Sequence, residues 1–459
     1  MMRMLGVMAV GLLMPALAAG QTSPFNGGVP TGQATSASLS LSLSDAISRG
    51  LDHNLGVILE EQQVRASGSN RLRALSDLLP HLSGTVRESR QIVSLAAFGF
   101  TGFGDIVLPT LVGPFNVFDA RVAMSTPIVD LAAWQRLHEA SASESAARAS
   151  YQQARETVVL AVGNLYLMAL ADQARLASSD AQVATAESLV RLADDRHASG
   201  LVAQIDVVRQ QVQLQGARAQ QISARSALAN RKLQLARAIG LPAGQAFELT
   251  TTSAFVASQT PSLDDALKEA EAHRPEILSA RARVEAATAA RRAAVAGSLP
   301  SLHVDADVGA IGTTTGSAEP TYTVAASLRV PIFAGGQRRA DVQRADAELR
   351  QRQAELADLE NGLHYEIESA LLTLDAAAAG VDVATSAAAL AKDELTQAQD
   401  RFSAGVAGTV EVVQAQEAVA RASEQYITSV YQHTIAKAGL ARAMGDAETR
   451  FLALVGGQQ

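Results

Sequence analysis

Two stretches of the sequence, RHASGLVAQIDVVRQ (196–210) and RFSAGVAGTVEVVQA (401–415), repeat one pattern at an offset of 205 residues. Each begins with Arg, has Gly four residues later, and has an acidic residue six residues after that Gly. Glycine takes positive φ readily where a helix ends, and an acid suits the first turn of the helix that follows. Each stretch therefore indicates the turn of a helical hairpin, and the chain has two of them.

The repetition extends along most of the chain, as a duplication would require. The matching segments are LSDAI (43–47) with LDDAL (263–267), LLPHL (78–82) with SLPSL (298–302), and TPIVD (126–130) with VPIFA (330–334). The offset falls from 220 residues for the first two pairs to 204 for the third. The first copy therefore has extra residues, which we place at 95–114 as either a loop or an extended strand. We expect repeat 1 at 41–241, a connector at 242–262, repeat 2 at 263–446 and a tail at 447–459.

Helices are expected to dominate both repeats. No proline occurs at 128–241 or 332–459, and these stretches are rich in good helix formers. The expected helices are 43–79, 129–198 and 203–239 in repeat 1, and 263–298, 335–402 and 408–444 in repeat 2. The long ones would reach roughly 100 Å, which matches two shorter helices placed end to end. This indicates a tall helical bundle or barrel, although a soluble coiled-coil rod has the same pattern.

The hydrophobic period changes to two between Pro80 and Pro127 and between Pro300 and Pro331. In SLHVDADVG (301–309) the apolar residues alternate with His303, Asp305 and Asp307. We expect strands at 81–94, 115–128, 301–312 and 321–333. Their length suits a tilted strand that crosses a bilayer, with one face toward lipid and one toward water. A half-buried sheet of a soluble protein alternates in the same way.

The N-terminus has the features of a secretory signal. Arg3 precedes the apolar run MLGVMAVGLLMPALA (4–18), which ends in the small-x-small sequence Ala16-Leu17-Ala18. A membrane-spanning helix is the alternative, but the run is shorter than the roughly 20 residues that a span needs, and it contains Pro15. We expect a signal peptide at 1–18 and a flexible linker at 19–40, where Gly, Ser, Thr and Pro are frequent.

Composition excludes several classes of protein. The net charge of −8 does not suit a nucleic-acid surface. The chain has no cysteine, which excludes disulfides, thiolate metal sites and an acylated N-terminal cysteine. Its eight histidines are scattered, and no metalloprotease, P-loop, nucleophile-elbow or EF-hand motif occurs. The sequence predicts no enzyme, no cofactor and no metal site.

Four strands are too few for a membrane barrel, whose smallest form has eight. An open sheet edge cannot lie in lipid. If these strands cross a membrane, several chains must therefore share one barrel. Each strand pair leads directly into a long helix, so the helices would continue the tube on one side.

In these features the sequence resembles the TolC-like outer-membrane efflux proteins over about residues 40–446. The resemblance depends on the duplicated helix–strand–strand–helix order, on the paired hairpin phrases and on four prolines at the α/β junctions: Pro80, Pro127, Pro300 and Pro331. It implies a mainly α homotrimer with a shared 12-stranded barrel in outer-membrane lipid and a long periplasmic α-helical barrel. It also implies a passive exit duct of a tripartite efflux or type I secretion system, which works with a periplasmic adaptor and an inner-membrane transporter.

The resemblance also implies roles for particular residues. Adaptor docking falls on the turns Gly200-Leu201-Val202 and Gly405-Val406-Ala407. A constriction of the tunnel entrance falls on Glu411, where some relatives have an aspartate ring, and on Gln414, where those relatives have a second aspartate. The equivalent positions in the first repeat are Asp206 and Arg209. The expected barrel lumen consists of His303, Asp305, Asp307, Arg329, Asp119 and Arg121. The glycines could equally serve only the turns, and the acids only the helix dipole.

One other class of protein stays open at this point. A soluble periplasmic coiled-coil adaptor or tether would also have an export signal and long helices. Adaptors usually have one helical hairpin between β-rich domains, whereas this chain has two hairpins and four expected strands. That count favours the duct.

Overall fold

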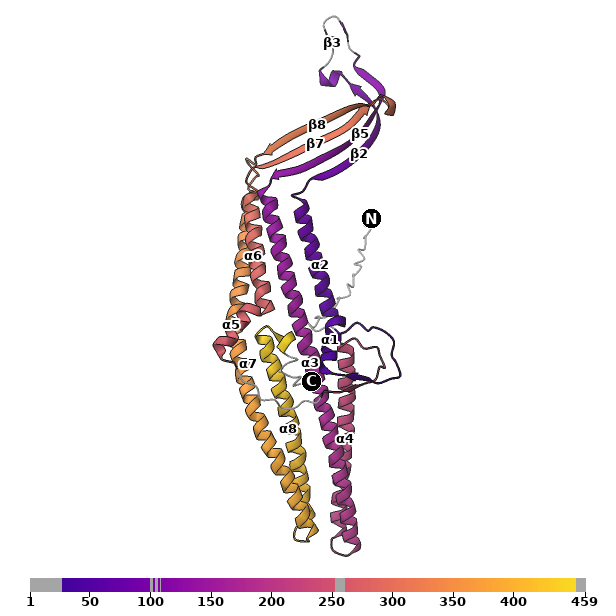
Figure 1. The fold of residues 1–459 in the computed structure, drawn as a ribbon, viewed down its shortest axis with the longest axis vertical. Helices are drawn as coiled ribbons and strands as arrows, with labels where there is room; N and C mark the ends of the chain where they lie inside the picture. The colour runs from indigo at the N-terminus through magenta and orange to yellow at the C-terminus, as the bar shows by residue number, and fades with distance from the viewer. Residues whose placement is uncertain (1–26, 100–101, 104–105, 108, 252–260, 451–459) are drawn as a thin grey trace, which may run out of the picture.

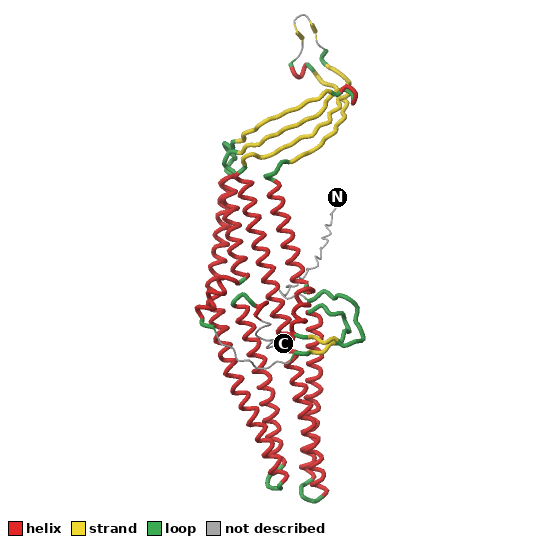
Figure 2. The backbone as a smooth tube through the Cα atoms, viewed as in Figure 1, coloured by secondary structure: helices red, strands yellow, loops and turns green. Residues whose placement is uncertain are grey.

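The computed structural model describes residues 27–99, 102–103, 106–107, 109–251 and 261–450. The expected signal peptide (1–18) lies outside the described residues, as does most of the tail. The molecule is elongated, with a β-sheet at one end and two helical hairpin turns at the other (Figure 1). Helix makes up nearly all of the long body between them (Figure 2).

The sheet has four antiparallel strands in the order β2-β5-β7-β8. Its strands are β2 (His81–Ser94), β5 (Leu111–Val129), β7 (Ser301–Gly312) and β8 (Glu319–Arg329). The sequence predicted the last strand to continue to residue 333, but β8 ends at Arg329. Pro331 has no N–H to donate to a neighbouring strand, and Gly335 and Gly336 turn the chain with φ of +58° and +88°.

The pairing register gives the sheet one polar and one apolar face. Ala123 lies opposite Asp307, and Ser125 lies opposite Asp305, so the charged positions of β5 and β7 share a face. The other face is apolar and largely uncovered. Its exposed side chains include Leu82, Val86, Val122, Val308, Tyr322, Val324 and Leu328. A face of this size and composition needs a partner or a membrane.

The extra residues of the first repeat form an arm beyond the sheet, at the end away from the helices (Figure 1). The arm contains a short 3₁₀ helix, η1 (Ala96–Phe98), and the paired strands β3 (Gly102–Phe103) and β4 (Ile106–Val107). In the second repeat the corresponding connection contains only η2 (Thr315–Ser317). The arm therefore consists of a short helical turn and a small strand pair, and it follows a bulge at Gln91/Val93 in β2.

Four helices make the long hairpins: α3 (Leu131–Ala198) with α4 (Gln204–Ala238), and α7 (Gln337–Ser403) with α8 (Thr409–Ala443). Their bounds lie within two residues of those expected from the sequence. The start of α3 is fixed by Asp130, whose side chain accepts a hydrogen bond from the Ala133 N–H at 2.8 Å. Such a cap satisfies one of the amides that every helix start leaves unpaired.

The helices expected at 43–79 and 263–298 are each broken in two, which corrects the prediction. The first consists of α1 (Leu43–His53) and α2 (Leu55–Ser76), and the second of α5 (Leu263–His273) and α6 (Pro275–Ala296). Asn54 is extended and fully buried, and its side chain accepts from the Gly56 N–H at 2.8 Å. Arg274 is extended because the next residue is Pro275, which disfavours helical geometry before it.

The expected linker (19–40) and connector (242–262) are partly ordered against each other, which is a second correction. The parallel strands β1 (Leu39–Leu41) and β6 (Phe247–Leu249) pair side by side. The Gln245 side chain accepts from the Thr35 N–H at 2.8 Å and donates to the Ala37 carbonyl at 2.8 Å. Strands of three residues are too short to show a hydrophobic alternation, so the sequence pattern did not indicate them.

Two joints at mid-height place shorter helices end to end beside α3 and α7 (Figure 1). At the first, the end of α4 meets the α1–α2 break, and the Gly28 N–H donates to Arg237 O at 2.7 Å. At the second, Gly445 lies against the backbone of Arg274, so close that a Cβ would be 2.4 Å from its Cα. The wall is therefore α2, α3, α6 and α7 above the joints, and α3, α4, α7 and α8 below them.

Candidate functional site: the hairpin tips and the channel wall

Both hairpin tips use the same helix-ending motif. The Gly200 N–H donates to His197 O at 2.9 Å and the Leu201 N–H to Arg196 O at 2.9 Å, while Gly200 has φ +72°. Gly405 repeats the motif with φ +78°. This is a Schellman ending, which places an apolar residue directly after the glycine. Here that residue stays outside the fold, because Leu201 is 71% exposed and its counterpart Val406 is 68% exposed.

The two tips of one chain are tied together. Arg196 on α3 donates to the carbonyls of Phe402 and Ser403, where α7 ends, and its guanidinium lies 4.6 Å from the centre of the Phe402 ring. On the next helices, Thr409 Oγ1 of α8 donates to Asp206 Oδ1 of α4 at 2.6 Å. These links join residues that are more than 200 positions apart in the sequence.

The four constriction candidates are held in ion pairs or line one pocket. Asp206 also accepts from Arg209 at 3.2 Å, and Glu411 accepts from Arg401 at 2.8 Å. Arg209 and Gln414 line a pocket of about 430 Å³ between α4 and α8. Its other walls are mainly apolar: Ile205, Val208, Val212, Gln213, Val410 and Val413. Both candidate acids, Asp206 and Glu411, therefore have an arginine partner in the single chain.

Sequence reasoning missed three of the residues that organise the tips, Arg196, Arg401 and Thr409. Arg196 and Arg401 are the first residues of the two repeated stretches. Their equivalent positions were the feature of the sequence that could have identified them. No pattern indicated Thr409, which is 2% exposed and is the first residue of α8. Its partner lies in the other hairpin, so only the fold brings the two together.

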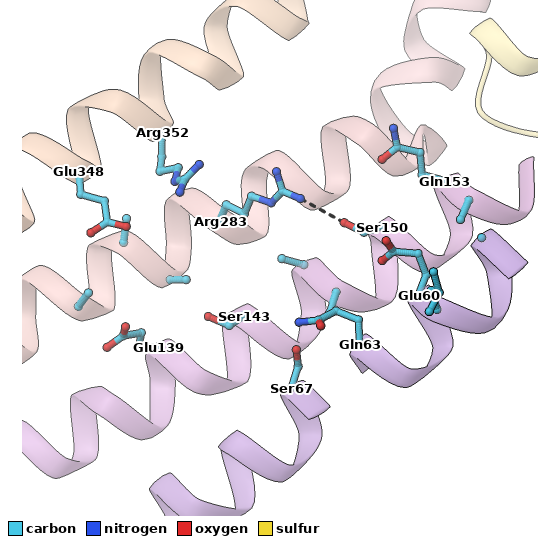
Figure 3. Close-up of a pocket in the computed structure, with 18 of the residues that line it drawn as sticks. Glu60, Gln63, Ser67, Glu139, Ser143, Ser150, Gln153, Arg283, Glu348 and Arg352 are labelled. Carbon is cyan, nitrogen blue, oxygen red and sulfur yellow. Dashed lines mark hydrogen bonds between the residues drawn. The ribbon is translucent and has the colours of Figure 1, made fainter. Parts of the chain in front are cut away.

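Above the joints, the helix layer has a large concave cavity of about 830 Å³ (Figure 3). Polar side chains from all four upper helices line it: Glu60, Gln63, Ser67, Glu139, Ser143, Ser150, Gln153, Arg283, Glu348 and Arg352. Arg283 donates to Ser150 Oγ at 3.2 Å. Burial raises the pKa of Glu139, the negative charge of Glu348 raises it further, and Arg136 opposes both.

The second joint contains a dense network of charges. Arg274 bonds to Glu276 at 3.3 Å and to Glu366 at 2.7 Å, and Arg442 lies 3.6 Å from Glu276. Glu156 of α3 is 7% exposed and lies close enough to this network for Glu276, Arg442 and Arg274 to affect its pKa. Burial raises the pKa of Glu156 to about 7, with smaller contributions from neighbouring charges. The joint therefore has a carboxyl group that titrates near neutral pH.

The expected lumen residues lie together on the polar face of the sheet. Arg121 makes a two-point contact with Asp119, with both distances 2.7 Å, and reaches Asp307 at 3.2 Å. Ser125 Oγ donates to Asp305 at 2.6 Å. Near the helix end of the sheet, His303, Asp305 and Arg329 line one shallow pocket. The four junction prolines lie within two residues of the ends of these strands.

A comparison with protein families identifies the chain. The family model described as "Outer membrane efflux protein" matches residues 47–241 and 266–446. The chain belongs to the outer membrane efflux protein family. It is accordingly a protein of the outer membrane, and the soluble adaptor interpretation is not favoured.

Similar proteins agree with this family assignment. The pyoverdine export outer membrane protein OpmQ of Pseudomonas putida is 29% identical over 238 residues, so the alignment spans half of each chain. The outer membrane protein TolC of Escherichia coli is 24% identical over 72% of this chain and 70% of its own length. The crystal structure of the Campylobacter jejuni CmeC outer membrane channel superposes with a TM-score of 0.73 at 16% identity, covering 88% of this chain and 86% of that one. That likeness shows the shared fold.

Proposed function

We propose that this efflux protein is one of three identical subunits of a passive channel, whose strands close a single 12-stranded barrel in the outer membrane. The observation that supports this most directly is the sheet itself. Its outer strands, β2 and β8, have no partner on their far sides in the described chain. Lipid cannot satisfy those backbone groups, and one chain has half the strands of the smallest barrel. Three copies would pair β2 of one subunit with β8 of the next.

The helices support the same assembly. The outermost lower helices, α4 and α7, have exposed apolar side chains that a single chain leaves uncovered. They are Ile205, Val212, Ile222 and Leu233 on α4, and Tyr365, Leu372, Val383 and Leu390 on α7. Stripes of this kind are the usual contact surface between long helices. In the trimer they would close a helical tunnel that extends into the periplasm.

The membrane would surround the sheet and not the long helices. Both α3 and α7 contain an 18-residue window with mean hydropathy 1.3. At 68 and 67 residues, however, they are several times longer than a bilayer span requires. The apolar face of the sheet, in contrast, has strands of the right length and is open to lipid. Its polar face, with Asp119, Arg121 and Asp307, would then line the water-filled lumen.

The tunnel would do no chemistry. We assign the working parts to the tips, where the Arg196 and Asp206–Thr409 links would hold the two hairpins of each subunit together at rest. Three copies of Glu411, with Asp206 beside it, would form a ring of acids whose negative charge Arg401 and Arg209 partly offset. The remaining negative charge of such a ring favours cations. The exposed turns at Gly200–Val202 and Gly405–Ala407 are available to a periplasmic adaptor, which would connect the duct to an inner-membrane transporter.

The mass of the detergent-extracted protein tests the assembly. Light scattering with the detergent contribution subtracted should give three chains per particle. Because the chain has no cysteine, pairs introduced on β2 and β8 should link subunits into covalent dimers and trimers. The matched control is Ala120→Cys with Ala310→Cys. These residues are directly paired within one chain, so their disulfide should form no covalent dimers or trimers. A monomer that needs no detergent would overturn the proposal.

A further inference from the structure

Three side chains near the α/β junction face away from the concave cavity. Trp134, Arg292 and Arg339 each lie nine residues from a cavity residue on the same helix, namely Ser143, Arg283 and Glu348. At about 100° per residue, nine residues correspond to two and a half turns. The three side chains therefore project from the convex side of the wall, from the three adjacent helices α3, α6 and α7.

These residues also share one level of the molecule. Trp134 is three residues after the start of α3, Arg339 two residues after the start of α7, and Arg292 four residues before the end of α6. All are within about one helical turn of the junction, directly beside the sheet. We call Trp134, Arg292 and Arg339 the junction collar.

The two arginines of the junction collar have no partner within the part of the chain that the structure describes. Both are exposed, and among the described residues neither makes an ion pair or hydrogen bond. Arg291, which directly precedes Arg292, differs because it pairs with Asp346. The nearest acid on α7, Asp341, lies two residues after Arg339 and so about 200° around the helix. In a chain with net charge −8, this is a local excess of positive charge.

Apolar surface adjoins these charges. Leu131, Val295 and Leu299 line a groove of about 240 Å³ between α3 and α6, and Arg292 lies on its wall. On the connection from β8 to α7, Ile332 and Phe333 are 95% and 89% exposed. This arrangement is complementary to a phospholipid. The acyl chains would contact the apolar groove and the Trp ring, and the phosphate would bind the guanidinium groups.

We propose that the junction collar binds anionic phospholipid head groups of the periplasmic leaflet, with Arg292 and Arg339 contacting the phosphates. This inference rests on the proposed function, because it requires the sheet to lie in the membrane and the helices below it. It adds a lipid class and the residues that select it. Unpaired arginines attract anionic lipids over zwitterionic ones, and salt weakens the preference.

Trp134 provides the probe, because it is the only tryptophan in the chain and is 51% exposed. The full-length protein is reconstituted in phosphatidylcholine vesicles, and dibrominated phosphatidylglycerol or dibrominated phosphatidylcholine is added in increasing fractions. Bromine quenches Trp fluorescence on contact. We expect the apparent affinity for phosphatidylglycerol to be about tenfold higher at low salt and to approach that for phosphatidylcholine at high salt.

The variant Arg292→Gln/Arg339→Gln should lose this preference while both lipids still quench at saturation. The matched control is Arg283→Gln/Arg352→Gln, which removes the same charge from the cavity-facing side of the same two helices and should keep the preference. Equal quenching by both lipids in the unmodified protein would overturn the collar and leave the membrane location intact. No quenching by either lipid would overturn the membrane location as well. If lipopolysaccharide, but not phosphatidylglycerol, competes for Trp134, the collar faces the opposite leaflet and the inference is wrong.

Discussion

Replacing Arg196 by Gln should loosen the contact between the two hairpin tips of each subunit. Arg196 donates to two carbonyls at the end of α7 and lies over the Phe402 ring. Charge-assisted hydrogen bonds contribute about 1.5–3 kcal/mol each where they are shielded from water, and a cation over a ring at an exposed site about 0.5–1 kcal/mol. Because Arg196 is only partly buried, we take about 2 kcal/mol for the whole contact.

A loss of about 2 kcal/mol from the closed arrangement multiplies the ratio of open to closed tips by about thirty. Single-channel recording in planar bilayers measures that ratio directly as open probability. The matched control is Arg191→Gln on the same helix, because the Arg191 side chain bonds only to Ser188 of its own helix, at 3.0 Å, among the described residues. Both variants should migrate as trimers, which shows that each is folded.

The reasoning is refuted if the Arg196 and Arg191 variants open equally often. Combining Arg196→Gln with Thr409→Val gives a second check, since the Thr409–Asp206 bond is a separate link between the same hairpins. If both links hold one closed state, the double variant should open more often than either single variant. A double variant that matches Arg196→Gln would show that the Thr409 link does not contribute.

Three further predictions concern the turn, the joint and the core. Gly405→Val places a β-branched residue at φ +78°, which should destabilise the turn by about 1–2 kcal/mol. We expect this variant to reduce efflux of a fluorescent dye. Gly216→Ala, in an open helical position, should leave efflux unchanged. A pKa of Glu156 raised to about 7 means that its neutral form stabilises the folded state: that stability is present below about pH 4.5 and is lost as pH rises to 7, by about 3 kcal/mol. Glu156→Gln should therefore flatten the fall in apparent Tm between pH 5 and 7, and an unchanged slope would contradict the assignment. Tyr166→Phe removes a buried hydroxyl that donates to Leu41 O at 2.8 Å and should lower the free energy of unfolding by about 1–3 kcal/mol; an unchanged Tm would show that the bond is not needed.

The parts of the fold that repeat a pattern over many residues were predictable from the sequence. The ends of α3 and α7 follow from proline-free stretches and from a glycine at positive φ. The β7 strand was predicted because its alternation continues over nine residues or more. Asn54 breaks a helix without proline or glycine, and its buried side chain caps the second segment by accepting from the Gly56 N–H. Pro275 was a readable signal for the second break, yet the apolar period continued across it.

At the hairpin tips, too, some features could be predicted from the sequence and others could not. Gly200 and Gly405 could be placed from sequence because their conformational role is local. The partners of Arg196 and Asp206 could not, because each contact joins the two repeats and depends on how the hairpins pack. The contact between Glu411 and Arg401 lies within one hairpin, but it forms only where α8 folds back on α7, so the sequence pattern did not show it. Local geometry is encoded in short stretches, whereas electrostatics at a contact depends on both of its sides.

The end-to-end joints have a mechanical consequence. Above and below mid-height, two of the four wall helices in each subunit are separate rods: α2 and α6 above, α4 and α8 below. Of the helices in the described residues, only α3 and α7 are continuous through that level. The lower helices α4 and α8 can tilt or slide at their upper ends without breaking a backbone hydrogen bond inside the upper helices α2 and α6. In the proposed channel, the tip end would therefore widen while the sheet, held in the membrane, keeps its shape.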